Sequence, residues 1–221
     1  MNKVVVFGTG GMGAMVRHYL TFRSDYTVVA HTIDSESISS PKYEGLPLVP
    51  FETVEEAYPP AGYAMIIALG YLGLGPNQLR AQRYAEARNK GYTLISYLDK
   101  TAVIADGVAT GDNCIICPNL TIEPFAKIGN NVIARSGCYI GHDVIIGDHC
   151  FIGPHAVIGG NTIIEPFAFL GANSTVRNGI KIAKGCVIGA GATILKNTRE
   201  NEVYRGLTSK PLAKKSYQIP L

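Results

Sequence analysis

The sequence lacks the features of a membrane-spanning protein and of a nucleic-acid-binding protein. No apolar run reaches the length of about 18 residues that a transmembrane helix needs. The opening residues, MNKVVVFGTG, reach glycines after four apolar residues, which is unlike a signal peptide. The formal net charge is only +3, and no arginine-rich stripe is interleaved with aromatic residues. We therefore expect a soluble cytoplasmic protein with no transmembrane segment and no nucleic-acid partner.

What the sequence has instead is a repeat with a period of six residues. From residue 104 to residue 194, an aliphatic or small residue occupies every sixth position without an insertion, and a glycine follows half of these positions. Only Thr110 and Ala134 are not aliphatic in the usual sense. The repeat positions are Ile104, Thr110, Ile116, Ile122, Ile128, Ala134, Ile140, Ile146, Ile152, Ile158, Ile164, Leu170, Val176, Ile182, Ile188 and Ile194.

A period of six is too short for a helical hairpin and fits a short strand followed by a corner. Three such strands close a prism of about 18 residues per coil, so residues 18 apart stack with a rise of roughly 4.8 Å. The run makes about five coils. An antiparallel β sandwich is disfavoured because its turns would vary in length. The sequence therefore predicts a parallel β-helix.

The same register accounts for the cysteines. Cys114 and Cys117 have C-x-x-C spacing, which could indicate a metal site or a disulfide. However, the register places one set of residues in a single inward ladder of small side chains: Cys114, Val132, Cys150, Ala168 and Cys186. Cys138 occupies the same position of its own hexad. We interpret the cysteines as small core residues.

The N-terminal part predicts a different fold. An apolar strand over residues 3–7 runs into Gly8-Thr-Gly-Gly-Met-Gly13, and helical spacing follows. Strand, glycine turn and helix form the phosphate-binding start of a Rossmann-like unit. A second strand over residues 27–33 ends at Asp34, where an acidic residue can accept hydrogen bonds from a ribose.

Further elements complete a small α/β domain. We expect a short helix with a capping box at residues 53–56, a buried strand over 63–69, a helix from Pro76 to near Gly91, and a last strand over 92–98. The predicted organisation is a Rossmann-like nucleotide-sugar-binding domain over residues 1–98, a β-helix over 99–198 and a C-terminal cap and tail over 199–221.

Three motifs together carry a resemblance to a known family. The motifs are Gly8-Thr-Gly-Gly-Met-Gly13 with Asp34, then Gly141-His142-Asp143, and finally Ile188-Gly-Ala-Gly-Ala192. The chain resembles bacterial sugar acyltransferases related to sialic acid O-acetyltransferase, especially the nucleotide-amino-sugar N-acetyltransferases. The resemblance implies a left-handed parallel β-helix, a homotrimer, and acetyl-CoA or another acyl-CoA in a groove between neighbouring β-helices. It also implies that the nucleotide-linked sugar is bound through Gly8, Gly10, Gly11, Met12, Gly13 and Asp34.

His142 is the candidate general base. A neutral imidazole, whose ordinary pKa is about 6.5, can take a proton from an attacking amine or hydroxyl. Asp143 can orient the ring and stabilise the imidazolium, and in the resembled family the corresponding acid is usually Glu. The alternative interpretation of His142 is a solvated turn histidine.

Gly160 lies 18 residues beyond His142 and therefore one coil above it. Its backbone N–H can donate to the thioester oxygen as that oxygen becomes an oxyanion, a role that the resemblance also implies. The alternative is a corner glycine that needs a positive φ. For the cofactor, Gly160, Gly189, Ala190, Gly191 and Ala192 are expected to line the pantetheine groove, and Lys196 to meet the CoA phosphates.

These features predict an acyl-CoA-dependent N-acyltransferase in which the sugar amine attacks the thioester directly. The alternatives are an O-acetyltransferase and a non-catalytic scaffold or sugar-binding protein. An NAD enzyme is disfavoured because a β-helix, rather than a second half-domain, follows the glycine turn. The family often has a second histidine where Phe151 stands, and we interpret His149 and His155 as surface turn residues. They point about a third of a turn apart, which disfavours a three-histidine zinc site, and we expect no metal.

Overall fold

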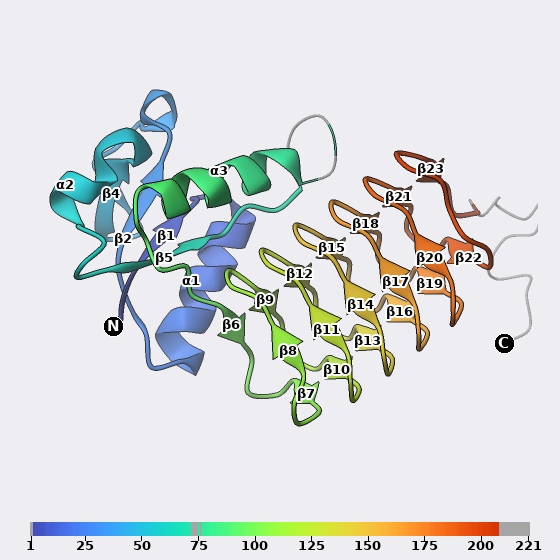
Figure 1. Ribbon diagram of the computed structural model, residues 1–221. Helices are drawn as coiled ribbons and strands as arrows, with labels where there is room; N and C mark the ends of the chain where they lie inside the picture. Colours follow the sequence, from blue (N-terminus) through green and yellow to red (C-terminus); the bar gives the residue numbers. More distant parts are fainter. Residues whose placement is uncertain (1, 72–74, 76, 208–221) are drawn as a thin grey trace, which may run out of the picture.

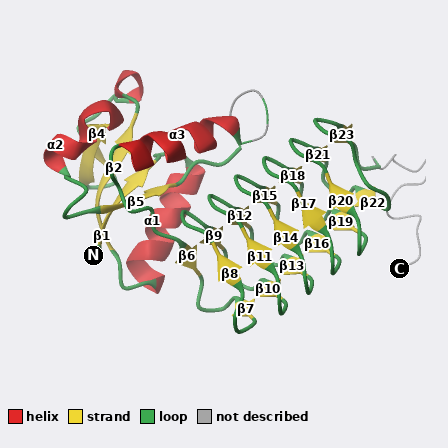
Figure 2. Cartoon of the chain, in the orientation of Figure 1, coloured by secondary structure: helices red, strands yellow, loops and turns green. Residues whose placement is uncertain are grey.

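The computed structural model describes residues 2–71, 75 and 77–207. It shows an α/β domain followed by a left-handed parallel β-helix, which confirms the predicted fold class (Figure 1). The coils stack away from the α/β domain, and their strands are short, with turns at every corner (Figure 2). Within the described part of the chain, none of the helices combines the length and the apolar character needed to cross a membrane.

The α/β domain is built on a five-stranded sheet with strand order β3-β4-β2-β1-β5, parallel except for the β3–β4 pair. Its elements are β1 (Lys3–Phe7), α1 (Gly11–Arg23), β2 (Thr27–Ile33), η1 (Ser35–Ser37), β3 (Lys42–Tyr43), β4 (Leu46–Pro50), η2 (Phe51–Thr53), α2 (Val54–Ala57), β5 (Ala64–Ile67) and α3 (Gln78–Asn89). The predicted strand, glycine turn, helix and second strand are all present.

Alternation along β1 divides the core of this domain into two layers, because successive side chains of a strand point to opposite faces. Val4 and Val6 pack in a cluster with residues of α1 and with outward-facing residues of the β-helix. Val5 and Phe7 pack in a second cluster that includes α3 residues such as Tyr84. The sheet is therefore covered on both faces, and one of its layers is shared with the β-helix.

Three details of the predicted α/β domain differ from the structure or fall outside it. Helix α2 follows Thr53 as expected, but the Thr53 side chain makes no capping hydrogen bond. The predicted strand over 92–98 is divided: Leu94 forms only an isolated bridge with Met65, and Tyr97–Leu98 (β6) pairs with the β-helix. The Tyr97 ring stacks on Tyr19 of α1 at 5.2 Å, so the chain has already left the sheet there. Pro76 lies outside the described residues.

The β-helix has three faces. The first face consists of β6 (Tyr97–Leu98), β9 (Ile115–Ile116), β12 (Ile133–Ala134), β15 (Phe151–Ile152), β18 (Phe169–Leu170), β21 (Val187–Ile188) and β23 (Val203–Tyr204). The second consists of β7 (Val103–Ile104), β10 (Thr121–Ile122), β13 (Tyr139–Ile140), β16 (Val157–Ile158), β19 (Thr175–Val176) and β22 (Thr193–Ile194). The third consists of β8 (Ala109–Thr110), β11 (Lys127–Ile128), β14 (Ile145–Ile146), β17 (Ile163–Ile164) and β20 (Lys181–Ile182).

Pairing along each face follows the 18-residue rule through the hexads, as when Thr121 pairs with Tyr139 and Ile122 with Ile140. We call the turns after the first-face strands the first corner, those after the second-face strands the second corner, and those after the third-face strands the third corner. After Ile194 the hexads stop, but β23 adds one more strand to the first face beyond β21. The predicted cap region therefore contributes a strand to the β-helix.

Burial confirms the interpretation of the cysteines as core residues: four lie in the prism interior, and Cys117 lies in the core that the β-helix shares with the α/β domain. All five thiols are buried and unpaired with one another, and the ladder of small inward residues is buried throughout. Burial raises the pKa of the Cys150 thiol to about 12 and that of Cys114 to about 11. Because the thiolate is the reactive form, these cysteines are poor nucleophiles at neutral pH.

Helix α3 attaches the α/β domain to the third corner. The Arg80 guanidinium is buried and donates hydrogen bonds to the carbonyl oxygens of Asn131, His149 and Cys150. Tyr84, one turn later, donates to Asp112 at the same corner. Figure 1 shows α3 lying along the edge of the first coils, which leaves the second corner uncovered by the α/β domain.

Candidate active site

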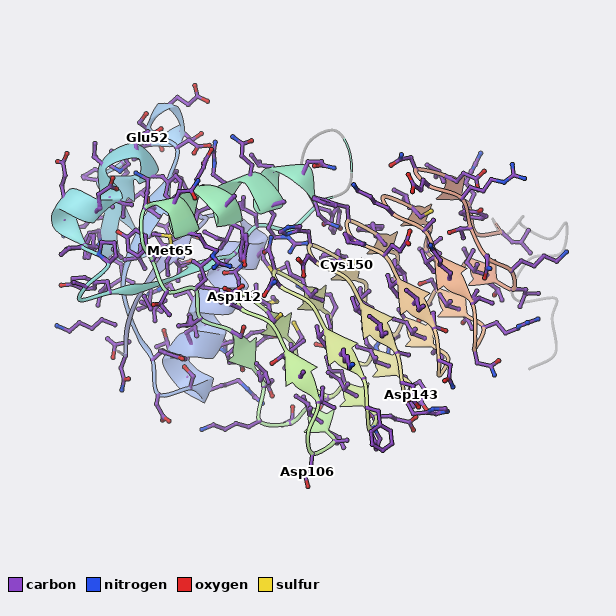
Figure 3. All side chains as sticks on the ribbon, viewed as in Figure 1. Glu52, Met65, Asp106, Asp112, Asp143 and Cys150 are labelled. Atoms are coloured by element: carbon purple, nitrogen blue, oxygen red, sulfur yellow. The ribbon has the colours of Figure 1, made fainter. Side chains whose placement is uncertain are left out.

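His142 and Asp143 stand on the second corner, at the end of β13. The His142 Nδ1 atom lies 2.9 Å from Asp143 Oδ2, and the two side chains are 55% and 49% exposed. A carboxylate only accepts hydrogen bonds, so Nδ1 carries the proton and Nε2 presents a lone pair to solvent. Figure 3 shows Asp143 at the lower edge of the β-helix, far from the labelled residues of the α/β domain. The pair has the arrangement of a general base and its orienting acid.

The backbone around His142 is held in place by the neighbouring coils. Its N–H donates to Glu123 Oε2 at 2.9 Å, and its carbonyl accepts from the Asn161 N–H at 2.8 Å. Asp143 has a φ of 58°, the left-handed value that several corner residues of this β-helix share. The imidazole therefore projects from a fixed corner. Glu123 is a contributor that the sequence reasoning missed.

Position 160 requires glycine because it lies against the His142 imidazole. Its φ is outside the positive range, so the alternative interpretation, a corner glycine that needs left-handed backbone, is wrong. A Cβ at this position would lie 2.6 Å from His142 Nε2, closer than real contacts allow. Among the described residues, the Gly160 N–H has no hydrogen-bond acceptor. A free backbone donor thus adjoins the candidate base, where it can stabilise an oxyanion.

The expected cofactor residues divide between two corners. Lys196 is exposed and lies on the second corner, in the same column as His142 and Gly160, three coils or roughly 14 Å above His142. Gly189, Ala190 and Gly191 form the first corner instead, directly above Ala172 in register. Ala192 is buried immediately after that corner. A single chain therefore does not bring all of these residues to one groove.

A cavity of about 500 Å³ lies between the glycine turn and the first face of the β-helix. Its α/β wall includes Gly10, Gly11 and Met12, and its β-helix wall includes Arg135, Phe151, Pro154, Phe169 and Ala172. The Phe151 and Phe169 rings are stacked at 5.1 Å, and the Tyr71 ring meets both edge to face at 5.1 and 5.2 Å. The size is that of a small-molecule site.

The remaining predicted substrate residues do not line this cavity. Gly8 has a φ of 119°, and a Cβ on Gly13 would lie 2.3 Å from the Gly8 carbonyl oxygen, so both glycines shape the turn. Asp34, at the end of β2, forms an ion pair with Arg83 of α3 at 2.9 Å. The cavity residues of the β-helix, including Arg135, were missed by the sequence reasoning. A signal for them was present in the sequence: because residues 18 apart stack, Phe169 lies directly above Phe151, and the two form an outward-facing aromatic pair.

His149 differs from its predicted surface position. It is half-buried at the third corner, between the rings of Tyr84 and Phe167 at 5.5 and 4.8 Å, and burial lowers its pKa. Its Nδ1 is 2.9 Å from Asn131 Nδ2. His155 is exposed at the first corner, as expected. In the described part of the chain, no three His, Cys, Asp or Glu side chains are grouped so that they could hold a metal ion.

Comparisons with known proteins bear on the hexapeptide repeats and on the fold. Residues 125–160 and 161–196 each match the family model described as bacterial transferase hexapeptide (six repeats). These two segments span the corners that carry His142, Gly160, Gly189 and Lys196.

Solved structures match almost the whole chain. PerB from Caulobacter crescentus, in complex with CoA and GDP-perosamine, is 24% identical with a TM-score of 0.82, covering 93% of this chain and 95% of its own. The acetyltransferase domain of PglB from Neisseria gonorrhoeae, in complex with acetyl coenzyme A, is 21% identical with a TM-score of 0.82, covering 96% and 99%. WeeI from Acinetobacter baumannii is 23% identical with a TM-score of 0.77, covering 90% and 94%. At these identities the similarity establishes the fold.

Proposed function

We propose that the protein is an acyl-CoA-dependent N-acyltransferase, in the simplest case an N-acetyltransferase, that acts on a nucleotide-linked amino sugar. The observation that carries the proposal is the exposed His142 imidazole, oriented by Asp143 and adjacent to the free N–H of Gly160. The similar fold of PerB, which was solved with CoA and GDP-perosamine, supports the substrate classes. We assign the reaction to the cytoplasm, where it would supply modified sugars for polysaccharide biosynthesis.

We assign three roles in the reaction: general base, oxyanion donor and general acid. The sugar amine attacks the thioester carbonyl carbon, and His142 Nε2 takes the proton that the amine loses. The Gly160 N–H donates to the carbonyl oxygen as negative charge develops on it. The carbon–sulfur bond then breaks, the imidazolium returns its proton to the CoA sulfur, and the amide product remains. Because all five cysteines are buried, none can reach the thioester to form an acyl-enzyme, and the acyl group passes directly from CoA to the amine.

The reaction requires residues from two corners, and we propose that a homotrimer unites them. Nucleotide binding is assigned to residues 1–98, acyl transfer to 99–198 and capping to 199–221. The glycine-turn cavity is lined by residues of the first corner, whereas His142 stands on the second. Exposed apolar side chains flank His142 and Gly160 on both adjoining faces: Tyr139, Ile145, Val157 and Ile163. A neighbouring chain that covers these residues would place its first corner opposite His142.

We expect light scattering at micromolar chain concentration to give a mass of about 71 kDa, three times the 23.7 kDa of one chain. Ile145→Lys should shift this mass toward that of a single chain, because a buried lysine charge at an interface is costly. Lys127→Gln, an exposed change on the same face, serves as the control. A wild-type protein that stays monomeric would refute the shared site.

Asp34→Ala should weaken binding of the nucleotide sugar by roughly tenfold or more, because hydrogen bonds to a charged acceptor contribute about 1.5–3 kcal/mol. Affinity for acyl-CoA should stay unchanged, since CoA is assigned to the β-helix. Calorimetric titration of each ligand tests this, with Glu36→Ala as a nearby exposed control. Asp34 is paired with Arg83, so Arg83→Ala separates a ligand contact from loss of the ion pair. Equal losses for both ligands would contradict the assignment.

The activity itself is tested by incubating acetyl-CoA with a panel of nucleotide sugars and measuring product masses. An acetylated product that resists mild hydroxylamine is an amide, whereas a sensitive product is the ester of an O-acetyltransferase. Folded protein that binds no CoA and forms no product would indicate a scaffold or a sugar-binding protein instead.

A further inference from the structure

Arg135 is a cation that lines the glycine-turn cavity. It follows β12 on the first corner and lines the cavity opposite Gly10 and Gly11. Its Nη1 atom lies 3.7 Å from the Met12 sulfur, which is a weak acceptor. Within the part of the chain that the structure describes, no carboxylate lies within ion-pair distance of this guanidinium.

The cavity around Arg135 is complementary to an anion. Among the described residues that line it, none is Asp or Glu. Helix α1, of 13 residues, begins at this cavity with no acidic residue in its first turn and no side-chain cap on Gly10. Unpaired backbone N–H groups and the positive end of the helix dipole favour negative charge there. A half-buried guanidinium beside an apolar wall needs a partner, since uncompensated charge is costly away from water.

We infer that Arg135 binds the diphosphate group of the acceptor from the β-helix side, opposite the glycine turn. This inference rests on the proposed function and adds a binding residue to it. The planar guanidinium can donate two parallel hydrogen bonds to phosphate oxygens. The acceptor is then held by both parts of one chain.

The position of Arg135 also orients the acceptor. With the diphosphate between Arg135 and the glycine turn, the sugar ring is left to the aromatic part of the cavity, formed by Tyr71, Phe151 and Phe169. Pro154 and Ala172 lie at the edge of that wall, on the first corner. The sugar amine thus points toward the corner that the proposed trimer places against His142.

The test is calorimetric titration of the full-length protein with UDP, GDP, CDP, ADP and dTDP, and separately with CoA. Arg135→Gln should weaken binding of the preferred nucleoside diphosphate by about ten- to a hundredfold and leave CoA affinity unchanged. Arg135→Lys should lose less affinity for the nucleoside diphosphate than Arg135→Gln, because lysine keeps the charge but cannot donate two parallel hydrogen bonds. Lys127→Gln removes an exposed cation from the third face and should leave both affinities unchanged. Thermal unfolding of each variant confirms that it is folded.

Two outcomes would overturn the inference and are distinguishable. If wild-type protein binds a nucleoside diphosphate and Arg135→Gln binds it equally well, Arg135 is not a ligand and the proposed function stands. If wild-type protein binds CoA but none of the nucleoside diphosphates, the acceptor class is wrong and the assignment of Arg135 fails with it.

Discussion

His142→Ala should lower kcat by about 10²–10⁴-fold while the affinity for acyl-CoA stays nearly unchanged. The physical reason is that His142 Nε2, with Nδ1 held by Asp143, presents a proton acceptor beside the Gly160 N–H. Without that acceptor, the amine must lose its proton to water as it attacks. Steady-state kinetics with a saturating acceptor, together with calorimetric titration of CoA, measure the two quantities separately.

His142→Asn distinguishes proton transfer from positioning. An amide keeps a polar shape at the corner but does not take up a proton at neutral pH, so this variant should be as slow as His142→Ala. His18→Ala, at an exposed histidine of α1, is the matched control and should retain full activity. A folded His142→Asn protein with nearly wild-type kcat would rule out the general-base role. A pH profile alone is less decisive, because the sugar amine also titrates.

Arg80→Ala should lower the free energy of unfolding by about 3–5 kcal/mol. Arg80 is 1% exposed, and burial lowers its pKa to about 10, so it remains charged at neutral pH. Its guanidinium donates to the carbonyl oxygens of His149 and Cys150 at 3.1 and 3.2 Å and to that of Asn131. Removing it leaves buried carbonyls without a donor and a void between α3 and the third corner.

Chemical denaturation at a fixed chain concentration measures this loss, since the stability of an oligomer depends on concentration. Arg88→Ala, on an exposed part of the same helix, should change the free energy by no more than about 0.5 kcal/mol. Arg80→Met refills most of the void but donates no hydrogen bond, so it should recover only part of the loss. A change below about 1 kcal/mol for Arg80→Ala would show that hydrophobic packing alone docks α3.

Much of the candidate site followed from spacing. The 18-residue rule placed Gly160 above His142, and the structure puts that glycine against the imidazole. The rule did not indicate why glycine is needed, since the constraint is the bulk of the His142 ring rather than the φ of Gly160. Glu123 was missed because its contact is to a backbone N–H, which any residue at position 142 except proline supplies.

The sequence by itself determined the β-helix, its 18-residue coil, the buried cysteine ladder and the strand, glycine turn and helix of the α/β domain. These features depend on regular or local spacing, and the residues of each hexad or turn are sufficient to specify them. Only the tertiary structure decided which corner α3 covers, where the chain passes from sheet to β-helix, and that Arg135 meets Met12 from 123 residues away. Such contacts depend on how the two parts of the chain pack together, and no periodic pattern of either part specifies that packing.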